Sequence, residues 1–285
     1  MSTFRIASAL GVALGAIFAG DAVAQCRPPV NSHEARLLAF YEVPAIFSLG
    51  AAPERLPNGA IEIGAEAAPV PSPSAALTHP EYCYQYTTNN TKLASLFGRP
   101  RIVVGLPAAM TLEASYLPPI TFMSARATVA SIAVARAQTL SFVDPRLTLL
   151  LRAHGTIGRV TGPITCPSAS LQTTDAGAPC YGTTPSSDHF DPNSLGVEGA
   201  LSATSGRFSG YVGGGATWLS PHFQAGFTDA AGITDRTTVD VALVRGTAFA
   251  GGSLRVRDDL RISAQLYAVP ADATTARIAF AYRVR

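Results

Sequence analysis

Hydrophobic and polar residues alternate one by one along many short stretches of this chain, and these stretches are rich in Val, Ile, Ala, Thr and aromatic residues. In the last stretch Ile278 and Phe280 fall on one side, while Arg277 and Arg283 fall on the other. A period of two places alternate side chains on opposite faces of a β-strand. The same pattern recurs at 61–66, 146–154, 194–204, 207–218 and 260–267. It predicts an all-β protein whose strands have one apolar and one mixed polar face.

The composition favours a barrel in a membrane over a soluble sheet protein. Charged residues make up 14% of the chain and hydrophobic residues 47%, which leaves little charge to coat a soluble surface. The polar faces carry many small residues, as is typical of side chains that share a crowded barrel interior. We therefore predict a closed antiparallel transmembrane β-barrel over residues 59–285. A soluble secreted β-sandwich that binds a ligand is the alternative fold.

Connection lengths predict the topology of this barrel. Two long polar segments, Pro71–Gly98 and Ile164–Asn193, fall on the same side when strands are counted from about Ala60, and tight turns such as Pro107–Ala109 fall on the other. Bacterial outer-membrane barrels have this asymmetry and an even number of strands. The count is about twelve and includes expected strands at His222–Thr228, Thr237–Phe249 and Ser253–Arg257. Ten strands are the alternative, because Gly246–Arg257 is difficult to divide.

The first residues indicate export. Arg5 precedes the apolar stretch Ile6–Ala19, and Ala22-Val23-Ala24 follows. A basic residue, a short apolar stretch and small residues in this order are typical of a secretory signal peptide. We predict a signal peptide over residues 1–24. After Ala24 no apolar run approaches the ~18 residues that a membrane helix needs, so a mature chain in a membrane would cross it with strands. The predicted location is the Gram-negative outer membrane.

Residues 25–58 do not alternate. Leu37, Leu38 and Tyr41 have nearly helical spacing, which predicts a short helix over His33–Tyr41 that ends before Pro44. The segment is either a periplasmic lead-in to the barrel or a plug inside it.

Four cysteines in an exported chain without a C-x-x-C pair predict disulfides. Cys166 and Cys180 bracket a Thr/Ser/Pro-rich segment and are expected to form a disulfide across one loop. Cys26 would then pair with Cys83 by elimination. Four cysteines allow three connectivities, and the sequence alone does not choose among them. If Cys26 does bond to Cys83, which lies in the first long loop, the N-terminal segment must pass through or around the barrel. That bond would favour the plug.

The candidate functional residues are charges on the polar strand faces, which are expected to point into the lumen. In a pore such charges select solutes, whereas in a narrow barrel they form hydrogen-bonded ion pairs that fill the interior. The sequence does not choose between these two roles. The candidates are Glu62, Glu66, Glu113, Arg152, His154, Glu198, Arg207, Asp240, Arg261, Arg277 and Arg283.

The sequence lacks the spacings of common catalytic and metal sites. It has no G-x-S-x-G elbow and no His-x-x-x-His or His-Glu-x-x-His spacing, so neither an enzyme nor a cofactor is predicted. Asp175, Asp188 and Asp191 offer oxygen ligands near the predicted loop staple, but we interpret them as a solvated loop. The net charge of +2 gives no general attraction to nucleic acid.

Two hairpins resemble known proteins. The stretch RIVVGLPAAMTLEASY at 101–116 and the stretch 260–285, which begins LRISAQLYAV and ends IAFAYRVR, resemble porin-like outer-membrane barrels. That group includes hydrophobic-compound channels of the long-chain fatty-acid transporter type. The resemblance covers about residues 58–285 and implies a barrel with passive transport. Proteins of this group usually end in an aromatic residue, whereas this chain ends in Arg285.

Three functions follow as expectations. The first is a passive channel or transporter for small or hydrophobic solutes. The second is a structural or surface-adhesive barrel, and the third is the soluble binding protein that a sandwich fold would imply. For either barrel the expected partners are outer-membrane lipid, lipopolysaccharide and the barrel-assembly machinery.

Overall fold

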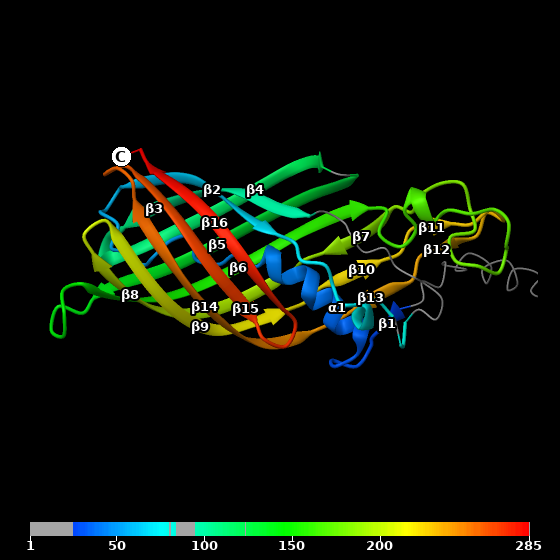
Figure 1. The fold of residues 1–285 in the computed structure, drawn as a ribbon, viewed down its shortest axis with the longest axis horizontal. Coiled ribbons are helices and arrows are strands. Elements are labelled where there is room, and N and C mark those ends of the chain that lie inside the picture. The colour runs from blue at the N-terminus through cyan, green and yellow to red at the C-terminus, as the bar shows by residue number, and fades with distance from the viewer. Residues whose placement is uncertain (1–24, 80, 84–94, 123, 285) are drawn as a thin grey trace, which may run out of the picture.

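The computed structural model describes residues 25–79, 81–83, 95–122 and 124–284 of the chain. Ten antiparallel strands form a closed barrel (Figure 1). The ring closes because β6 pairs with β8 on one side and β16 pairs with β2 on the other. In order around the ring the strands are β2 (Ile61–Pro69), β3 (Leu96–Leu106), β4 (Met110–Phe122), β5 (Ala125–Thr139), β6 (Leu147–Gly162), β8 (Ser194–Ser205), β9 (Phe208–Leu219), β14 (Leu243–Arg255), β15 (Leu260–Val269) and β16 (Ala273–Arg283).

The barrel has ten strands, which is the alternative to the expected count of about twelve. The segment expected to be a strand at 222–228 forms only the short pieces β10 (His222–Gln224) and β11 (Phe227–Thr228), which lie outside the wall. The two strands expected between 237 and 257 are instead one wall strand, β14, preceded by the short β13 (Thr238–Asp240). The strand continues through Gly251, which pairs with both β9 and β15, and position 251 requires glycine because a Cβ there would lie 2.6 Å from the Tyr211 ring.

The two ends of the barrel differ in the length of their connections. One end, called the turn end here, has the short connections 107–109, 140–146, 206–207 and 256–259. The other, called the loop end, has the long connections 70–95, 163–193 and 220–242. Both long segments expected on one side therefore lie at the same end. The C-terminus lies at the turn end (Figure 1).

The outward face of the wall is apolar. Side chains such as Ile157 and Ile278, which are 68% and 64% exposed, cover it along all ten strands. Among the described residues, the only charged side chains on this face are Arg126, Arg136 and Arg159. Ten residues separate Arg126 from Arg136 on β5, which at ~3.4 Å per residue and a tilt of about 40° is roughly 26 Å along the barrel axis. Membrane barrels have an apolar band about 25 Å tall. The outward face therefore has the height and polarity of a lipid-facing surface.

A small sheet extends the wall beyond the loop end. The strand β7 (Asp188–Asp191) pairs with the last residues of β6, and β10, β13 and β1 (Gln25–Cys26) follow in that order. β11 pairs separately with β12 (Thr234–Asp235). Short 3-10 turns, η2 (Ala75–Thr78) and η4 (Ser168–Ser170), lie in the long connections. In Figure 1 these pieces project past the barrel. Within the described ranges, no helix has the length and apolar character needed to span a membrane.

The N-terminal segment runs through the lumen from the loop end to the turn end. It begins at β1, continues in α1 (His33–Glu42), whose first turn is capped by the Ser32 hydroxyl, and then in η1 (Val43–Ala45). The helix matches the prediction from its spacing, and it passes directly into η1, where Pro44 lies. At the turn end Gly59 donates to the Gly105 carbonyl, and Gly105 donates back to Ala60. Position 105 requires glycine, because a Cβ there would lie 2.1 Å from the Pro57 carbonyl oxygen. The segment is thus a plug that leads directly into β2.

Candidate functional site

Four arginines of the wall hold the plug in the middle of the lumen. Arg99 and Arg101 project from β3, Arg152 from β6 and Arg277 from β16, and all four are buried. Their guanidinium groups donate to five plug carbonyls, those of Val43, Ala45, Ile46, Phe47 and Ser48, over N···O distances of 2.6–3.4 Å. Irregular backbone in a membrane barrel is otherwise left with unpaired carbonyls, which are costly to bury. The arginines therefore allow a non-helical segment to cross the lumen.

Three buried carboxylates balance these guanidinium charges. Glu66 accepts from Arg99 at 2.6 Å and from Arg101. Glu113 accepts from Arg101 at 2.5 Å and from Arg152 at 3.2 Å. Glu198 accepts from Arg152 at 3.1 Å and from the Tyr267 hydroxyl at 2.9 Å. Four cations thus face three anions, and the plug carbonyls supply the remaining acceptors. We call these seven charged residues the lumen network.

The Phe47 ring of the plug lies at the centre of this network. The guanidinium carbons of Arg101, Arg99 and Arg152 lie 4.4, 4.7 and 5.0 Å from its centroid. Cations over an aromatic face are attracted by its quadrupole, and more strongly where water is excluded. Phe47 therefore adds a specific contact to the backbone hydrogen bonds and fixes the register of the plug.

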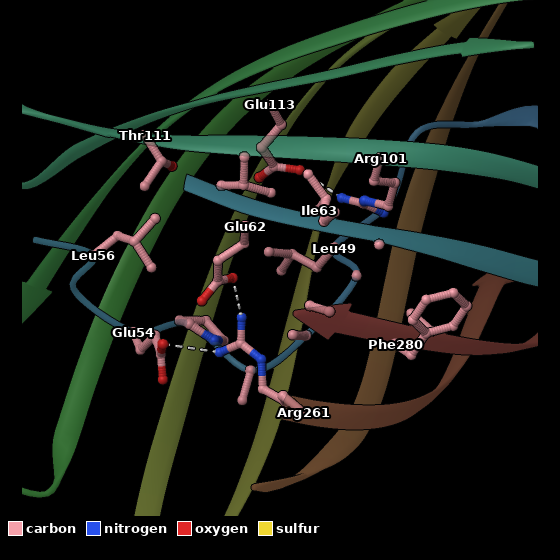
Figure 2. A pocket seen from close by; sticks show the side chains of 18 of the residues that line it. Leu49, Glu54, Leu56, Glu62, Ile63, Arg101, Thr111, Glu113, Arg261 and Phe280 are labelled. Carbon is pink, nitrogen blue, oxygen red and sulfur yellow. Dashed lines mark hydrogen bonds and ion pairs between the residues drawn. The ribbon is translucent and has the colours of Figure 1, made fainter. Parts of the chain in front are cut away.

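A second group of ion pairs fastens the plug at the turn end. Glu54 of the plug lies 3.1 Å from Arg261, which also pairs with Glu62 of β2 (Figure 2). Arg283 lies 2.6 Å from Glu54 and reaches Glu62 as well. Arg255 lies farther out, 3.4 Å from Glu54. The cavity beside this group has a volume of only about 80 Å³. At this level of the lumen the plug and the paired charges therefore leave little free volume.

At the loop end, Glu34 of α1 joins the plug to the first long connection. Its carboxylate accepts hydrogen bonds from the backbone N–H groups of Glu81, Tyr82 and Cys83. Burial opposes ionisation here, but these backbone donors outweigh it and hold the pKa of Glu34 below its ordinary value. The disulfide between Cys26 and Cys83 ties the same two segments covalently.

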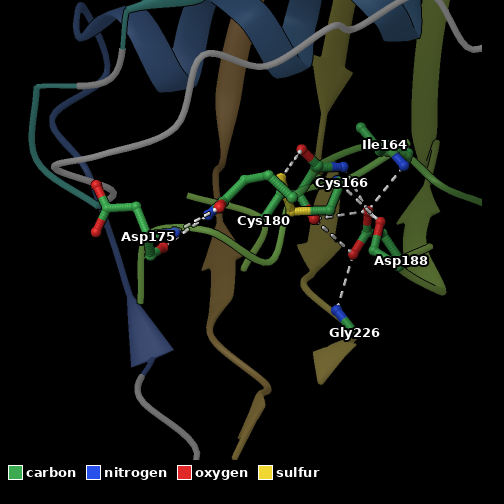
Figure 3. Close-up of a disulfide and its surroundings, with 9 residues drawn as sticks. Ile164, Cys166, Asp175, Cys180, Asp188 and Gly226 are labelled. Atoms are coloured by element: carbon green, nitrogen blue, oxygen red, sulfur yellow. Dashed lines mark hydrogen bonds between the residues drawn. A yellow bond between two sulfur atoms is a disulfide. The ribbon is translucent and has the colours of Figure 1, made fainter. Parts of the chain in front are cut away.

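Asp188 organises the second long connection. Its two oxygens accept from the N–H groups of Ile164, Thr165 and Gly226 and from the hydroxyls of Thr165 and Ser186, over 2.6–3.1 Å (Figure 3). The Cys166–Cys180 disulfide lies beside it. Asp188 is fully buried, so it is a structural centre of this loop and not part of a solvated surface.

An apolar cavity of about 330 Å³ lies between the plug and the wall near the loop end. The plug contributes Tyr41, Pro44 and Ala45 to its lining. The wall contributes Leu96, Phe97, Gly98, Leu117, Ile120, Ala125, Ala127 and Val160, and the segments beyond the loop end contribute Val70, Phe190 and Pro192. No lining side chain is charged. Arg99, which lies under the Phe97 ring, has its donors directed to Glu66, Ser131 and the plug carbonyls. The cavity therefore has the size and lining of a site for a small neutral apolar molecule.

The wall beside this cavity is not closed by a complete ladder of hydrogen bonds. In the described part of β3 and β4, pairing covers only Ile102–Leu106 with Met110–Ala114, although both strands continue toward the loop end. The continuing stretches contain Pro100, Pro118 and Pro119, which have no N–H to donate. We call this unpaired stretch the seam. Leu96 and Ile120, 48% and 54% exposed, stand on its two sides and line the cavity as well.

The structure places most of the sequence-derived candidates inside the barrel. Buried or half-buried on the inward faces of wall strands are Glu62, Glu66, Glu113, Arg152, His154, Glu198, Arg261, Arg277 and Arg283. Two candidates lie elsewhere. Arg207 is exposed in the turn between β8 and β9, because β8 ends at Ser205. Asp240 lies in β13, outside the wall, where it pairs with His222 at 2.5 Å and accepts from Gln25 at 2.6 Å.

Several charged residues of the interior were not among the candidates, among them Arg99, Arg101 and Glu54. Arg99 and Arg101 alternate with Pro100 and Ile102, so the period-two pattern extended two residues earlier would have included them. Glu54 lies in the plug, which has no strand periodicity, and no signal in the sequence places it beside Arg283.

Comparisons with known proteins find the barrel architecture and nothing more specific. No protein-family model matches the sequence, and no curated protein matches it. Among solved structures, the chain is similar to the outer membrane protease OmpT from Escherichia coli, at 8% identity and a TM-score of 0.38, covering 79% of this chain and 94% of that one. It is similar to Ail, the attachment invasion locus protein of Yersinia pestis, at 8% identity and a TM-score of 0.32, covering 79% and 98%.

A third similar structure is the P. putida toluene transporter TodX, at 12% identity and a TM-score of 0.27, covering 78% of this chain and 67% of that one. These three proteins are described as a protease, an attachment protein and a transporter, so the likeness does not distinguish among functions. At these identities and scores it carries no argument about the site. The chain has the all-β architecture of outer-membrane barrels.

Proposed function

We propose that this protein is an outer-membrane barrel that passes small, neutral, apolar solutes from its loop end, facing outward, into the membrane through the seam. The apolar cavity beside the unpaired stretch of β3 and β4 is the observation that carries the proposal. It brings an uncharged binding site next to the point where the wall has the fewest hydrogen bonds.

The filled lumen argues against an open aqueous pore as the working route. A hydrophilic solute entering at the loop end meets the plug, the lumen network and the ion pairs of Glu54 in turn. An apolar solute in the cavity has a shorter path, because Leu96 and Ile120, which line the cavity, are themselves 48% and 54% exposed at its edge. When such a solute moves into the lipid, no charged or hydrated group has to lose its water.

The lining also specifies the class of solute. Aromatic rings from Tyr41, Phe97 and Phe190 line the cavity, and Arg99 has its donors already directed to other groups. A carboxylate placed there would lose its hydration without gaining a partner. Neutral hydrocarbons and neutral aromatic compounds are therefore preferred over fatty-acid anions.

Uptake of a fluorescent dye by intact cells tests this function. The neutral dye N-phenyl-1-naphthylamine should enter cells that produce the protein severalfold faster than cells that do not, whereas an anionic naphthalenesulfonate dye should show no difference. Ala127→Trp fills the cavity from β5 and should abolish the gain. Ala130→Trp, on the outward face of the same strand, is the matched control and should retain it. Equal uptake with and without the protein would refute the proposal, and undiminished uptake by Ala127→Trp would remove the cavity from the route.

Surface binding is a second candidate role, which the sheet projecting beyond the loop end favours. β7, β10 and β13 hold an ordered platform there, reinforced by Asp188 and by the Cys166–Cys180 bond. Cells carrying a variant that lacks residues 165–187 should lose adhesion to host or abiotic surfaces if the platform is the binding element. Unchanged adhesion would argue against this role. That the protein is not an enzyme stays a prediction.

A further inference from the structure

The charged side chains on the outward face are distributed unevenly. Arg126 on β5 and Arg159 on β6 lie near the loop end, whereas Arg136 lies near the turn end. Arg126 is aligned with Thr161, and Thr128 with Arg159, so the two arginines are diagonal neighbours on adjacent strands. Together these four residues form a polar area, which we call the outer arginine patch, at the edge of an otherwise apolar surface.

The patch carries a net positive charge. Arg159 is 58% exposed and forms a two-pronged ion pair with Asp191, with both N···O distances at 2.7 Å. That pair uses one edge of the guanidinium group and leaves the other edge toward the surface. Arg126 is exposed and has no ion pair among the described residues. Two diagonal guanidinium groups repel each other unless an anion lies between them.

The position of the patch determines which anion can reach it. Arg126 and Arg136 mark the two limits of the apolar band, so the outer arginine patch lies at the depth of lipid headgroups. Arginine forms two parallel hydrogen bonds with phosphate oxygens, which makes it well suited to phosphate recognition. The Thr128 hydroxyl lies on the same outward face beside Arg159, and the Thr161 hydroxyl lies 3.1 Å from the Nδ1 of His189.

We propose that the outer arginine patch binds the phosphate group of a lipid of the outer leaflet, with lipopolysaccharide as the source. The proposal rests on the outward orientation of the loop end given under the proposed function, but not on solute passage. The acyl chains of the lipid would lie along the apolar residues Ala130, Ile132 and Ile157 below the patch.

Native mass spectrometry of the purified protein in a non-ionic detergent, titrated with diphosphorylated lipid A, tests the site. Loss of a charge-assisted hydrogen bond should weaken binding about tenfold or more in Arg126→Gln. Arg159→Gln should also weaken it. The matched control is Arg136→Gln, which removes the same charge from the same face of the same strand at the other limit of the band, and it should bind as the unmodified protein does. A heat-dependent shift in electrophoretic mobility confirms that each variant is folded.

Two further titrations distinguish the sources of phosphate. Lipid A without phosphate should bind the unmodified protein about tenfold more weakly than diphosphorylated lipid A does. It should bind Arg126→Gln as tightly as it binds the unmodified protein. Inorganic phosphate should fail to displace lipid A at millimolar concentration. Equal weakening by Arg136→Gln, indifference to the lipid phosphate, or displacement by inorganic phosphate would overturn the proposal. None of these outcomes depends on dye uptake, so the two proposals can fail separately.

Discussion

At the scale of single residues, Arg152 shows how tightly the plug and the wall depend on each other. Its guanidinium group contacts Glu113, Glu198 and the Phe47 carbonyl, and it lies over the Phe47 ring. Removing it leaves two buried carboxylates with fewer partners and a plug carbonyl with none of its present donors. Unpaired buried charge is among the few causes of large destabilisation by a single substitution.

We expect Arg152→Met to lower the free energy of unfolding by about 3–5 kcal/mol, because it breaks buried ion pairs while keeping most of the side-chain volume. Urea denaturation of the barrel in detergent, followed by intrinsic fluorescence and by the heat-dependent mobility shift, measures the change. Arg146→Met is the matched control, since Arg146 pairs with Asp144 on an exposed turn at the end of the same strand. The control should unfold at the same urea concentration as the unmodified protein. Equal destabilisation by both substitutions would contradict the role given to the lumen network.

Glu34 gives the attachment of the plug a dependence on pH. Its pKa in the folded protein lies below the ordinary value of 4.5, so its contribution to stability is present above pH 4.5 and is lost as the pH falls toward the folded pKa. Hydrogen-exchange protection of the amides at 81–83, corrected for the intrinsic effect of pH, should therefore decrease below pH 4.5. Glu34→Gln should give low protection at every pH. The exposed Glu81→Gln should keep the acid-induced decrease, and constant protection down to pH 3 in the unmodified protein would refute the assignment.

At the scale of elements, the second long connection depends on one carboxylate. Asp188 accepts from five donors, and an asparagine side chain offers only one oxygen, so several of these donors lose their acceptor in Asp188→Asn. Leaving buried donors unsatisfied costs about 1–3 kcal/mol for each group. We expect the connection 163–193 in this variant to be cleaved by proteinase K at least severalfold faster, while the barrel keeps its heat-dependent mobility. Asp175→Asn, in the exposed part of the same loop, should be cleaved at the original rate. Unchanged cleavage in Asp188→Asn would show that the disulfide alone orders the loop.

The alternation of side chains was sufficient to predict the fold class and most of the interior charges. Glu66, Glu113, Arg152 and Arg277 point inward because a strand with one lipid-facing side must direct its polar residues to the other side. The pattern could not settle the strand count. The glycines at 251 and 252 indicate a break in the sequence pattern, but in the structure they continue β14, because they pair with both neighbouring strands and aromatic rings occupy the space beside them.

The sequence offered the plug only as one of two alternatives and did not indicate the seam, for a different reason. The path of residues 46–58 depends on carbonyl groups, which every residue carries, and on arginines that come from strands far apart in the sequence. The seam depends on which hydrogen bonds fail to form between β3 and β4, and the prolines at 100, 118 and 119 suggest this only once the register of the two strands is known. Sequence patterns report the direction of side chains, whereas these two features are properties of the backbone.

At the scale of the whole molecule, the Cys26–Cys83 disulfide constrains where the plug can go. Residue 61 begins β2 at the turn end, and Cys26 is bonded to the first long connection at the loop end. The chain between them must therefore cross from one end to the other, and the lumen is the path that it takes. With the bond intact, the plug can shift inside the barrel but cannot be withdrawn through the turn end without pulling the loop that carries Cys83 after it. A route for solutes through the seam is compatible with this constraint, whereas a route that requires the plug to leave is not.

We therefore expect the oxidised protein to stay closed in planar bilayers, even under voltage or under urea at concentrations that leave the barrel folded. Reduction, or Cys83→Ser, should allow the plug to leave through the turn end once its hydrogen bonds to the arginines are broken, and stepwise openings should then appear. The matched control is the protein with Cys166→Ser and Cys180→Ser, which loses the other disulfide and should stay closed. Openings of equal size and frequency in the oxidised protein would show that the plug leaves by another path. They would also place solute passage in the lumen and not at the seam, so this measurement decides between the two routes.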